Sequence, residues 1–344
     1  MTRLGRGELY AALAAMGYGS AYVATAFALR SFEPLPVAVY RTLLGAVALG
    51  FVIAAARRAP GATGRGAAGG VTSASTPAGA ELAPAPARAS ATRRAMHLAV
   101  IAACGGPIFL SGMNLAIAGV GATVASFVAG LYAILAAVFA PFLLRERLRT
   151  QALVGFIAAL VGTAFLAELD VTGGGLAGIG WGLLAAVSFA LFLVLSRRWS
   201  RADGFDSLVV SLAVMTATTL FVGAFVLLTK PASLTPAGVG PEALVALAWL
   251  AFVAAAGGVL AVASTRLVPA SRTAAFLLLN PVTATILAFG LLGERISGVQ
   301  VLGGVLVLLG MAAATMDRPL RRTAAEAGAG SAGSAGSAGP AGSS

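Results

Sequence analysis

The sequence has very little of what a soluble enzyme usually needs. It contains one cysteine, one histidine and one lysine, and 12 acidic residues in a chain of 344. A single cysteine excludes an intramolecular disulfide, and a single histidine leaves no Cys/His cluster for a metal. Charged residues make up 10% of the chain, against about 25% in ordinary soluble domains. We therefore expect no metal or other cofactor, and a protein without the polar surface of a soluble globule.

Acidic side chains are also missing from the interior of the apolar segments. No aspartate lies inside them, and the glutamates, including Glu8, fall at their ends or between them. A membrane-embedded enzyme acting on lipid would need a convergent set, such as paired aspartates or serine with histidine. The only histidine, His97, lies at an expected membrane edge. The enzyme alternative stays open, but these absences weigh against it.

Long apolar segments dominate the chain, because 59% of its residues are hydrophobic. A transmembrane helix needs about 20 mostly apolar residues. Ten segments of about that length are present, and only Gly119 and its neighbours separate the third from the fourth. The expected spans are 8–29, 35–56, 96–117, 120–144, 150–167, 178–197, 206–229, 242–264, 271–292 and 297–316.

The basic residues predict how these spans are oriented. With a cytoplasmic N-terminus, the outer segments carry only Arg30, Lys230 and Arg295, and Arg41 lies within a span. All other basic residues then fall on the inner side, as the positive-inside rule requires. We therefore expect a multi-pass protein of the bacterial cytoplasmic (inner) membrane with both termini cytoplasmic. A net charge of +11 can also indicate nucleic-acid binding. Because the arginines cluster between apolar runs, the expected partners are instead the lipid bilayer and a small-molecule substrate.

Two stretches do not have the composition of a membrane segment. Residues 57–95 are rich in glycine, alanine, serine, threonine, proline and arginine without helical periodicity. The tail 323–344 repeats a Ser-Ala-Gly pattern. Both predict disordered, solvated segments, the first being a cytoplasmic loop.

The two halves of the chain resemble each other. A shift of 148 residues places Glu146 on Glu294 and Arg147 on Arg295, with matching glycines at corresponding distances, Gly155 on Gly303 and Gly162 on Gly310. Glycines seven residues apart lie on one helix face and allow close helix packing. Each repeat, 8–168 and 178–316, then contains five spans, so the second must enter the membrane from the opposite side. The predicted fold class is an all-α integral membrane protein with ten transmembrane helices in two inverted five-helix repeats, an arrangement typical of secondary transporters.

The repeat motifs resemble those of a known family, the EamA domain of the drug/metabolite transporter superfamily. The resemblance rests on Asn280-Pro281-Val282, Leu292-Gly293-Glu294-Arg295-Ile296, Leu144-Arg145-Glu146-Arg147-Leu148, Val39-Tyr40-Arg41 and the glycines named above. It covers about residues 8–316, and it departs where Tyr132-Ala133 replaces a proline pair and in the long loop. It implies a metabolite permease that works by alternating access, often an exporter of amino acids or related solutes. A channel is a further alternative, although no repeated pore-lining ring is visible.

Candidate substrate-binding residues are the polar side chains deep within the spans. Arg41 is the one ionisable residue clearly inside a span, where a charge is costly unless it pairs, faces water or snorkels. It is either a snorkelling or structural residue, or a guanidinium that binds a carboxylate or phosphate. Tyr132 and Asn280 are repeat equivalents near mid-membrane. The full set of candidates is Arg41, Tyr132, Asn280, Asn114, Tyr22 and Thr283, each of which could equally form an interhelical hydrogen bond.

Three further residues are candidates for gating. Glu146 and Glu294 end the fourth and ninth spans on opposite sides, where each could also cap an interfacial turn and pair with nearby arginines. Pro281 lacks an N–H and would leave a carbonyl free one turn earlier in its helix, beside Asn280.

Overall fold

The computed structural model describes residues 5–58, 90–144, 150–166, 175–236, 238–267, 276 and 279–315. Over this part the chain consists of helices and short connections, without a strand. The helices are α1 (Arg6–Ala28), α2 (Pro34–Arg58), α3 (Ala91–Ala103), α4 (Phe109–Gly130), α5 (Tyr132–Leu144), α6 (Thr150–Leu166), α7 (Gly175–Asp203), α8 (Ser207–Thr229), α9 (Pro241–Leu267), α11 (Leu279–Leu287) and α12 (Gly298–Thr315). Two π-helical turns, Cys104–Ile108 and Ala288–Leu292, follow α3 and α11, and a 3-10 turn, Pro231–Leu234, follows α8.

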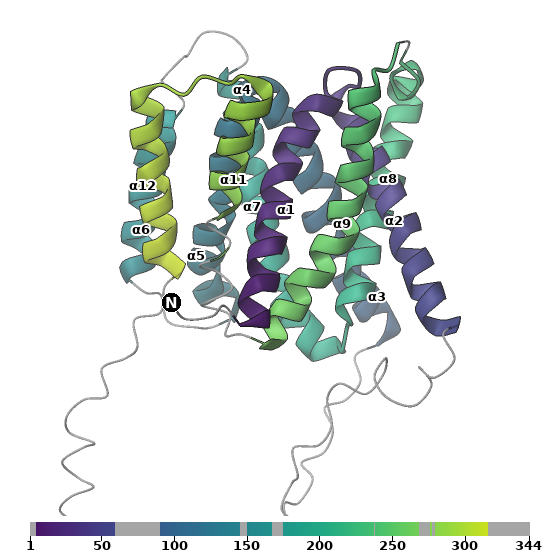
Figure 1. Ribbon diagram of the computed structural model, residues 1–344. Helices are drawn as coiled ribbons and strands as arrows, with labels where there is room; N and C mark the ends of the chain where they lie inside the picture. Colours follow the sequence, from purple (N-terminus) through teal and green to yellow (C-terminus); the bar gives the residue numbers. More distant parts are fainter. Residues whose placement is uncertain are drawn as a thin grey trace, which may run out of the picture.

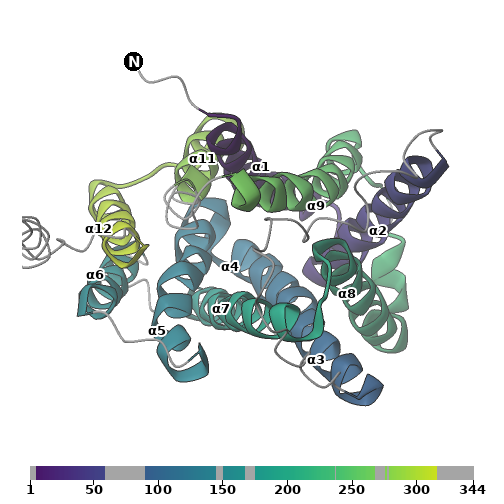
Figure 2. The same cartoon turned by 90° about the horizontal axis from the view of Figure 1, so that it is seen from below.

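The helices run roughly parallel or antiparallel to one another as a bundle (Figure 1). We call the end at which α1 begins the near end and the opposite end the far end. Seen along the bundle, α6 and α12 form a pair at one edge, and α2 and α8 lie at the opposite edge (Figure 2). Large apolar side chains project from the outside, for example Phe51, Phe142 and Leu228, which are 76%, 76% and 85% exposed. Such a surface suits lipid rather than water.

The length and composition of the helices fit a membrane protein. Among the described residues, five helical stretches are long and apolar enough to cross a bilayer, and four shorter apolar helices accompany them. Helix starts follow local chemistry. Pro34 and Pro241 are the first residues of α2 and α9, positions where the missing proline N–H costs nothing.

The break between the third and fourth expected spans lies at Gly121, two residues beyond Gly119. Gly121 has φ 79° and ψ 171°, a backbone conformation that essentially only glycine adopts. The helical residues of α4 before Gly121 continue α3 and its π turn, and those after it lead into α5. Composition alone could not distinguish the two glycines, because the difference lies in their backbone angles.

The loop expected at 57–95 is shorter at both ends than its composition indicates. α2 continues through Arg58, and α3 begins at Ala91. The Ser90 hydroxyl accepts a hydrogen bond from the Arg93 backbone N–H at 3.3 Å, which caps the start of α3. This cap explains why the helix starts before its apolar run does. Residues 59–89 and the tail 323–344 lie outside the described residues.

Contacts between helices occur in pairs related by the internal repeat. The extensive α1–α9 packing corresponds to α7–α4, and α1–α11 corresponds to α7–α5. The α2–α8 and α6–α12 pairs each join a helix to its own repeat equivalent. A pseudo-two-fold relation between two halves produces this pattern, because each contact then has a partner of the same kind.

The α6–α12 pair packs through the glycines that the repeat brings into register. A Cβ atom at Gly162 would lie 2.6 Å from the Gly303 carbonyl oxygen, and a Cβ at Gly303 equally close to the Gly162 carbonyl. The helices therefore touch backbone to backbone, which only glycine allows.

Gly303→Ala is expected to destabilise the protein by about 1–3 kcal/mol, because the new methyl group must force the two backbones apart. Melting of the purified protein in detergent measures this effect. Gly290→Ala is the matched control, since a Cβ there meets nothing within 4 Å. Equal melting temperatures for the two variants would contradict the close α6–α12 packing.

Candidate functional site

Arg41 is buried in α2 and does not reach the surface. The residue is 7% exposed, and its Nη1 atom is buried with no hydrogen-bond partner. Arg41 lies seven residues from the far-end start of α2, about 10 Å at the helical rise. This burial argues against snorkelling. Within the described part of the chain, no carboxylate pairs with this guanidinium.

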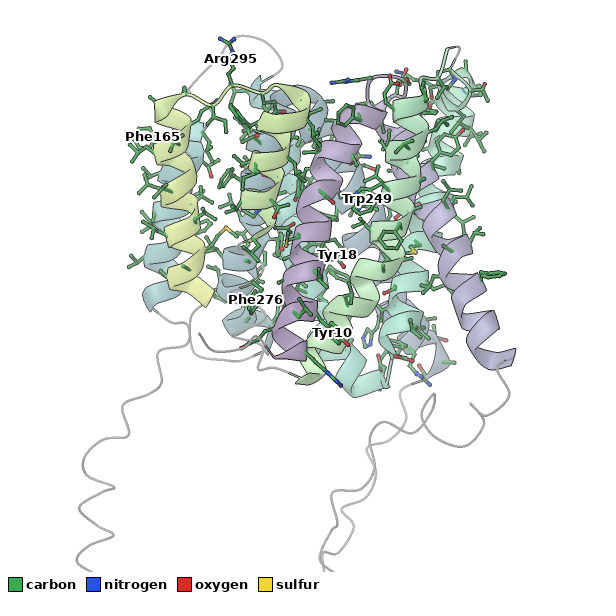
Figure 3. All side chains as sticks on the ribbon, in the orientation of Figure 1. Tyr10, Tyr18, Phe165, Trp249, Phe276 and Arg295 are labelled. Carbon is green, nitrogen blue, oxygen red and sulfur yellow. The ribbon has the colours of Figure 1, made fainter. Side chains whose placement is uncertain are left out.

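Two tyrosines of α1 lie around the guanidinium. Tyr18 and Tyr22 are one helical turn apart, and both are close enough to Arg41 to interact with it electrostatically. Tyr22 is 4% exposed, and Tyr18 lies at mid-height on α1 (Figure 3). Gly257 of α9 makes room for Tyr18, because a Cβ there would lie 2.9 Å from the tyrosine ring.

Tyr132 of the same repeat and Asn280 of the other repeat extend this cluster. Tyr132 is 5% exposed, and it lies close enough to Tyr22 and to Asn280 to interact electrostatically with both. The Asn280 Oδ1 atom is buried without a hydrogen-bond partner. The cluster therefore ends in an unpaired donor on Arg41 and an unpaired acceptor on Asn280. Buried polar groups in proteins are normally paired, so two such groups in one connected cluster call for an explanation.

Apolar aromatic side chains enclose one side of the cluster. The Tyr132 and Phe189 rings pack edge to face with their centroids 4.8 Å apart, and Phe109 lies 4.3 Å from Phe189 by the same measure. Phe189 comes from α7 and Phe109 from α4, so both repeats contribute to this wall. An apolar wall lowers the local dielectric and strengthens any interaction of Arg41 with an anion.

The remaining candidates occupy different places. Asn114 donates to the Pro34 carbonyl at 2.9 Å, at the far-end start of α2 rather than beside Arg41. Thr283 is half-buried one turn beyond Asn280, and a Cβ at Gly19 would lie 2.7 Å from its Cβ. Pro281 is buried in the first turn of α11. The carbonyl it would free belongs to residue 277, which lies outside the described residues, as does Glu146.

Glu294 lies at the far end and contacts the other repeat. Its Oε1 accepts from the Ala122 backbone N–H at 2.8 Å, and its Oε2 accepts from the Thr123 N–H at 3.1 Å. It therefore caps the part of α4 that begins after Gly121, rather than its own turn. Among the described residues it forms no ion pair with an arginine. Arg295 is exposed at the far end (Figure 3).

Sequence reasoning missed two members of this arrangement. The sequence could have identified Tyr18, because it precedes Tyr22 by one helical turn and so lies on the same helix face. The sequence holds no sign of the partner of Glu294, because that partner is a pair of backbone N–H groups more than 170 residues away.

Comparison with known proteins identifies the family. The model of the EamA-like transporter family matches residues 5–167 and 176–316. This chain belongs to the EamA-like transporter family. EamA-like proteins are members of the drug/metabolite transporter superfamily and are membrane transporters rather than enzymes. No curated protein matched the chain.

A solved crystal structure shares the fold of this chain. It superposes with a TM-score of 0.56 at 21% sequence identity, over 90% of this chain and 97% of that one. Sequence identity at this level indicates a shared fold, but it does not indicate which solute is transported.

Proposed function

We propose that the protein is a secondary transporter that carries a small anionic or zwitterionic metabolite, such as an amino acid or related solute, by alternating access. One observation carries this proposal: a buried, unpaired guanidinium surrounded by tyrosines where the two repeats meet. An uncompensated charge in an apolar interior is costly, and a carboxylate or phosphate of the substrate would compensate it. The unpaired Asn280 Oδ1 would accept from a donor on the same solute.

The proposed topology has ten spans in two inverted five-helix repeats, with both termini in the cytoplasm and the far end outside. The distribution of basic residues supports it, since the far-end connections carry only Arg30, Lys230 and Arg295. In inverted-repeat transporters the substrate site lies near the midplane at the repeat interface. Arg41, Tyr22, Tyr132 and Asn280 fit that place, and residues of both repeats form the cluster. The membrane is proposed to be the bacterial cytoplasmic membrane.

Counter-flow into liposomes tests the proposal. Vesicles with purified protein are loaded with one unlabelled solute and diluted into a trace of the same labelled solute, across amino acids, nucleosides and amphipathic drugs. For a carrier, a carboxylate-bearing solute is expected to accumulate transiently above its equilibrium level, because unlabelled solute leaving the vesicle returns the site to the outside. Equilibration without such an overshoot would indicate a channel. Failure of every solute to enter faster than into protein-free vesicles would contradict transport of these solutes.

A further inference from the structure

The Glu294 contact joins the segment that follows α11 to the second part of α4, which leads into α5, and α11 and α5 each carry one residue of the central cluster. Glu294 follows α11 and its π turn, and α11 carries Asn280. The helical segment that Glu294 caps runs from Ala122 toward α5, whose first residue is Tyr132. Tyr132 and Asn280 lie close enough to interact electrostatically, and each is in the first turn of its helix. The segment containing α11 and the segment from Ala122 through α5 therefore approach each other at two levels, once at the cluster and once at the far end.

The distance between the two connections is that of half a membrane. Ten residues separate Ala122 from Tyr132, about 15 Å along a helix. Any path from the cluster to the far end that runs between these elements would therefore meet the Glu294 contact. Opening such a path requires the two elements to separate there.

The chemistry of the contact is specific on both sides. Gly121 interrupts the hydrogen-bonding of α4, so the N–H groups of the residues that follow have no partner in their own helix. A carboxylate there accepts two hydrogen bonds and lies at the positive end of the helix dipole. On the other side, Gly293 adopts a left-handed conformation (φ 70°, ψ 20°), which ends the π turn directly before Glu294.

We propose that Glu294 is a clasp that closes the far end between the two repeats and must release Ala122 and Thr123 before the central cluster can open to that end. The inference rests on the proposed transport function for its purpose, but its physical content is an equilibrium between a closed and an open far end. The two hydrogen bonds stabilise the closed state by about the free energy that a helix N-cap contributes. Breaking it shifts the population toward the open state.

Thiol labelling tests the clasp without any substrate. The reporter is Thr123→Cys with Cys104→Ser, since Thr123 is 5% exposed beside the contact and Cys104 is the only native cysteine. Labelling is followed with a charged methanethiosulfonate on purified protein in detergent. Glu294→Ala is expected to raise the labelling rate about tenfold, the population change that a cap of ordinary strength would give. Glu294→Gln keeps the size of the side chain and can accept through one oxygen only, so a smaller rise is expected.

Two controls make the result specific. Glu33→Gln removes another far-end acid, one that forms an exposed 3.3 Å ion pair with Lys230, and it should leave the labelling rate unchanged. The native Cys104, labelled in protein that retains Thr123, reports loosening elsewhere and should not react faster when Glu294 is replaced. The proposal would be overturned if Cys at position 123 were labelled in both Glu294 variants at the same rate as in the protein that retains Glu294. An equal acceleration at Cys104 or an equal effect of Glu33→Gln would also overturn it. Because no solute is present, labelling as expected with failed counter-flow would reject the proposed transport function alone.

Discussion

Replacing Arg41 by glutamine is expected to lower transport of the carried solute at least about 100-fold while leaving the fold intact. A buried charge-assisted contact to a carboxylate typically contributes 2–5 kcal/mol, and 100-fold corresponds to about 2.8 kcal/mol. Stability should change in the opposite direction. The Nη1 atom of Arg41 has no partner, so removal of its charge from an apolar interior should leave the melting temperature unchanged or raise it.

The opposing signs distinguish a binding role from a structural one. An Arg41 that held helices together would lower the melting temperature when replaced, and loss of transport would simply follow loss of fold. Arg41→Lys refines the test, because lysine keeps the charge but loses the planar fork that binds a carboxylate with two hydrogen bonds. It should retain part of the transport.

Transport by each variant and by the parent protein is measured in the counter-flow assay. The melting temperature of each is measured in detergent. Arg30→Gln is the matched control. Arg30 is exposed at the far end and stacks on Phe27, with its guanidinium carbon 4.4 Å from the ring centroid. This substitution should change neither quantity. Parental transport by Arg41→Gln, or a lowered melting temperature, would refute the assignment of Arg41 to the substrate site.

The sequence predicts the general architecture because membrane helices are constrained by composition. A bilayer requires long apolar segments, and arginine distribution orients them, so composition predicts a helical membrane protein without any knowledge of contacts. The repeat adds a relation between distant positions. The same shift of 148 residues aligns Glu146 with Glu294 and Tyr132 with Asn280. That relation makes Tyr132 and Asn280 joint candidates, and in the structure they lie close enough to interact electrostatically.

Contacts that depend on backbone geometry could not be predicted in this way. Gly119 and Gly121 are chemically identical, and only the positive φ of Gly121 marks where the helix breaks. Asn114 has the polarity of a site residue, but its amide donates to the Pro34 carbonyl. For Glu294 the sequence left open a gating role and the capping of an interfacial turn, and its carboxylate accepts from backbone N–H groups of α4 in the other repeat. Hydrophobic patterns carry no information about which backbone groups lack partners.

Gly121→Ala is expected to be among the most destabilising single-methyl changes in the protein, by about 3 kcal/mol. Two effects combine. The backbone conformation of Gly121, φ 79° and ψ 171°, is strained for any residue with a Cβ. In addition, that Cβ would lie 2.9 Å from the Glu294 Oε1 atom, so the carboxylate must move. Melting in detergent measures the total.

Combining Gly121→Ala with Glu294→Ala separates these two effects. The double variant should recover about 1 kcal/mol relative to the sum of the single changes, because the steric conflict exists only while the carboxylate is present. The backbone strain should persist. Gly204→Ala is the matched control, since Gly204 also has a positive φ, 70°, but a Cβ there meets nothing within 4 Å. It should show no coupling to Glu294→Ala. Strict additivity at Gly121 would mean that the carboxylate does not rest against this glycine, and the contact between the repeats would have to lie elsewhere.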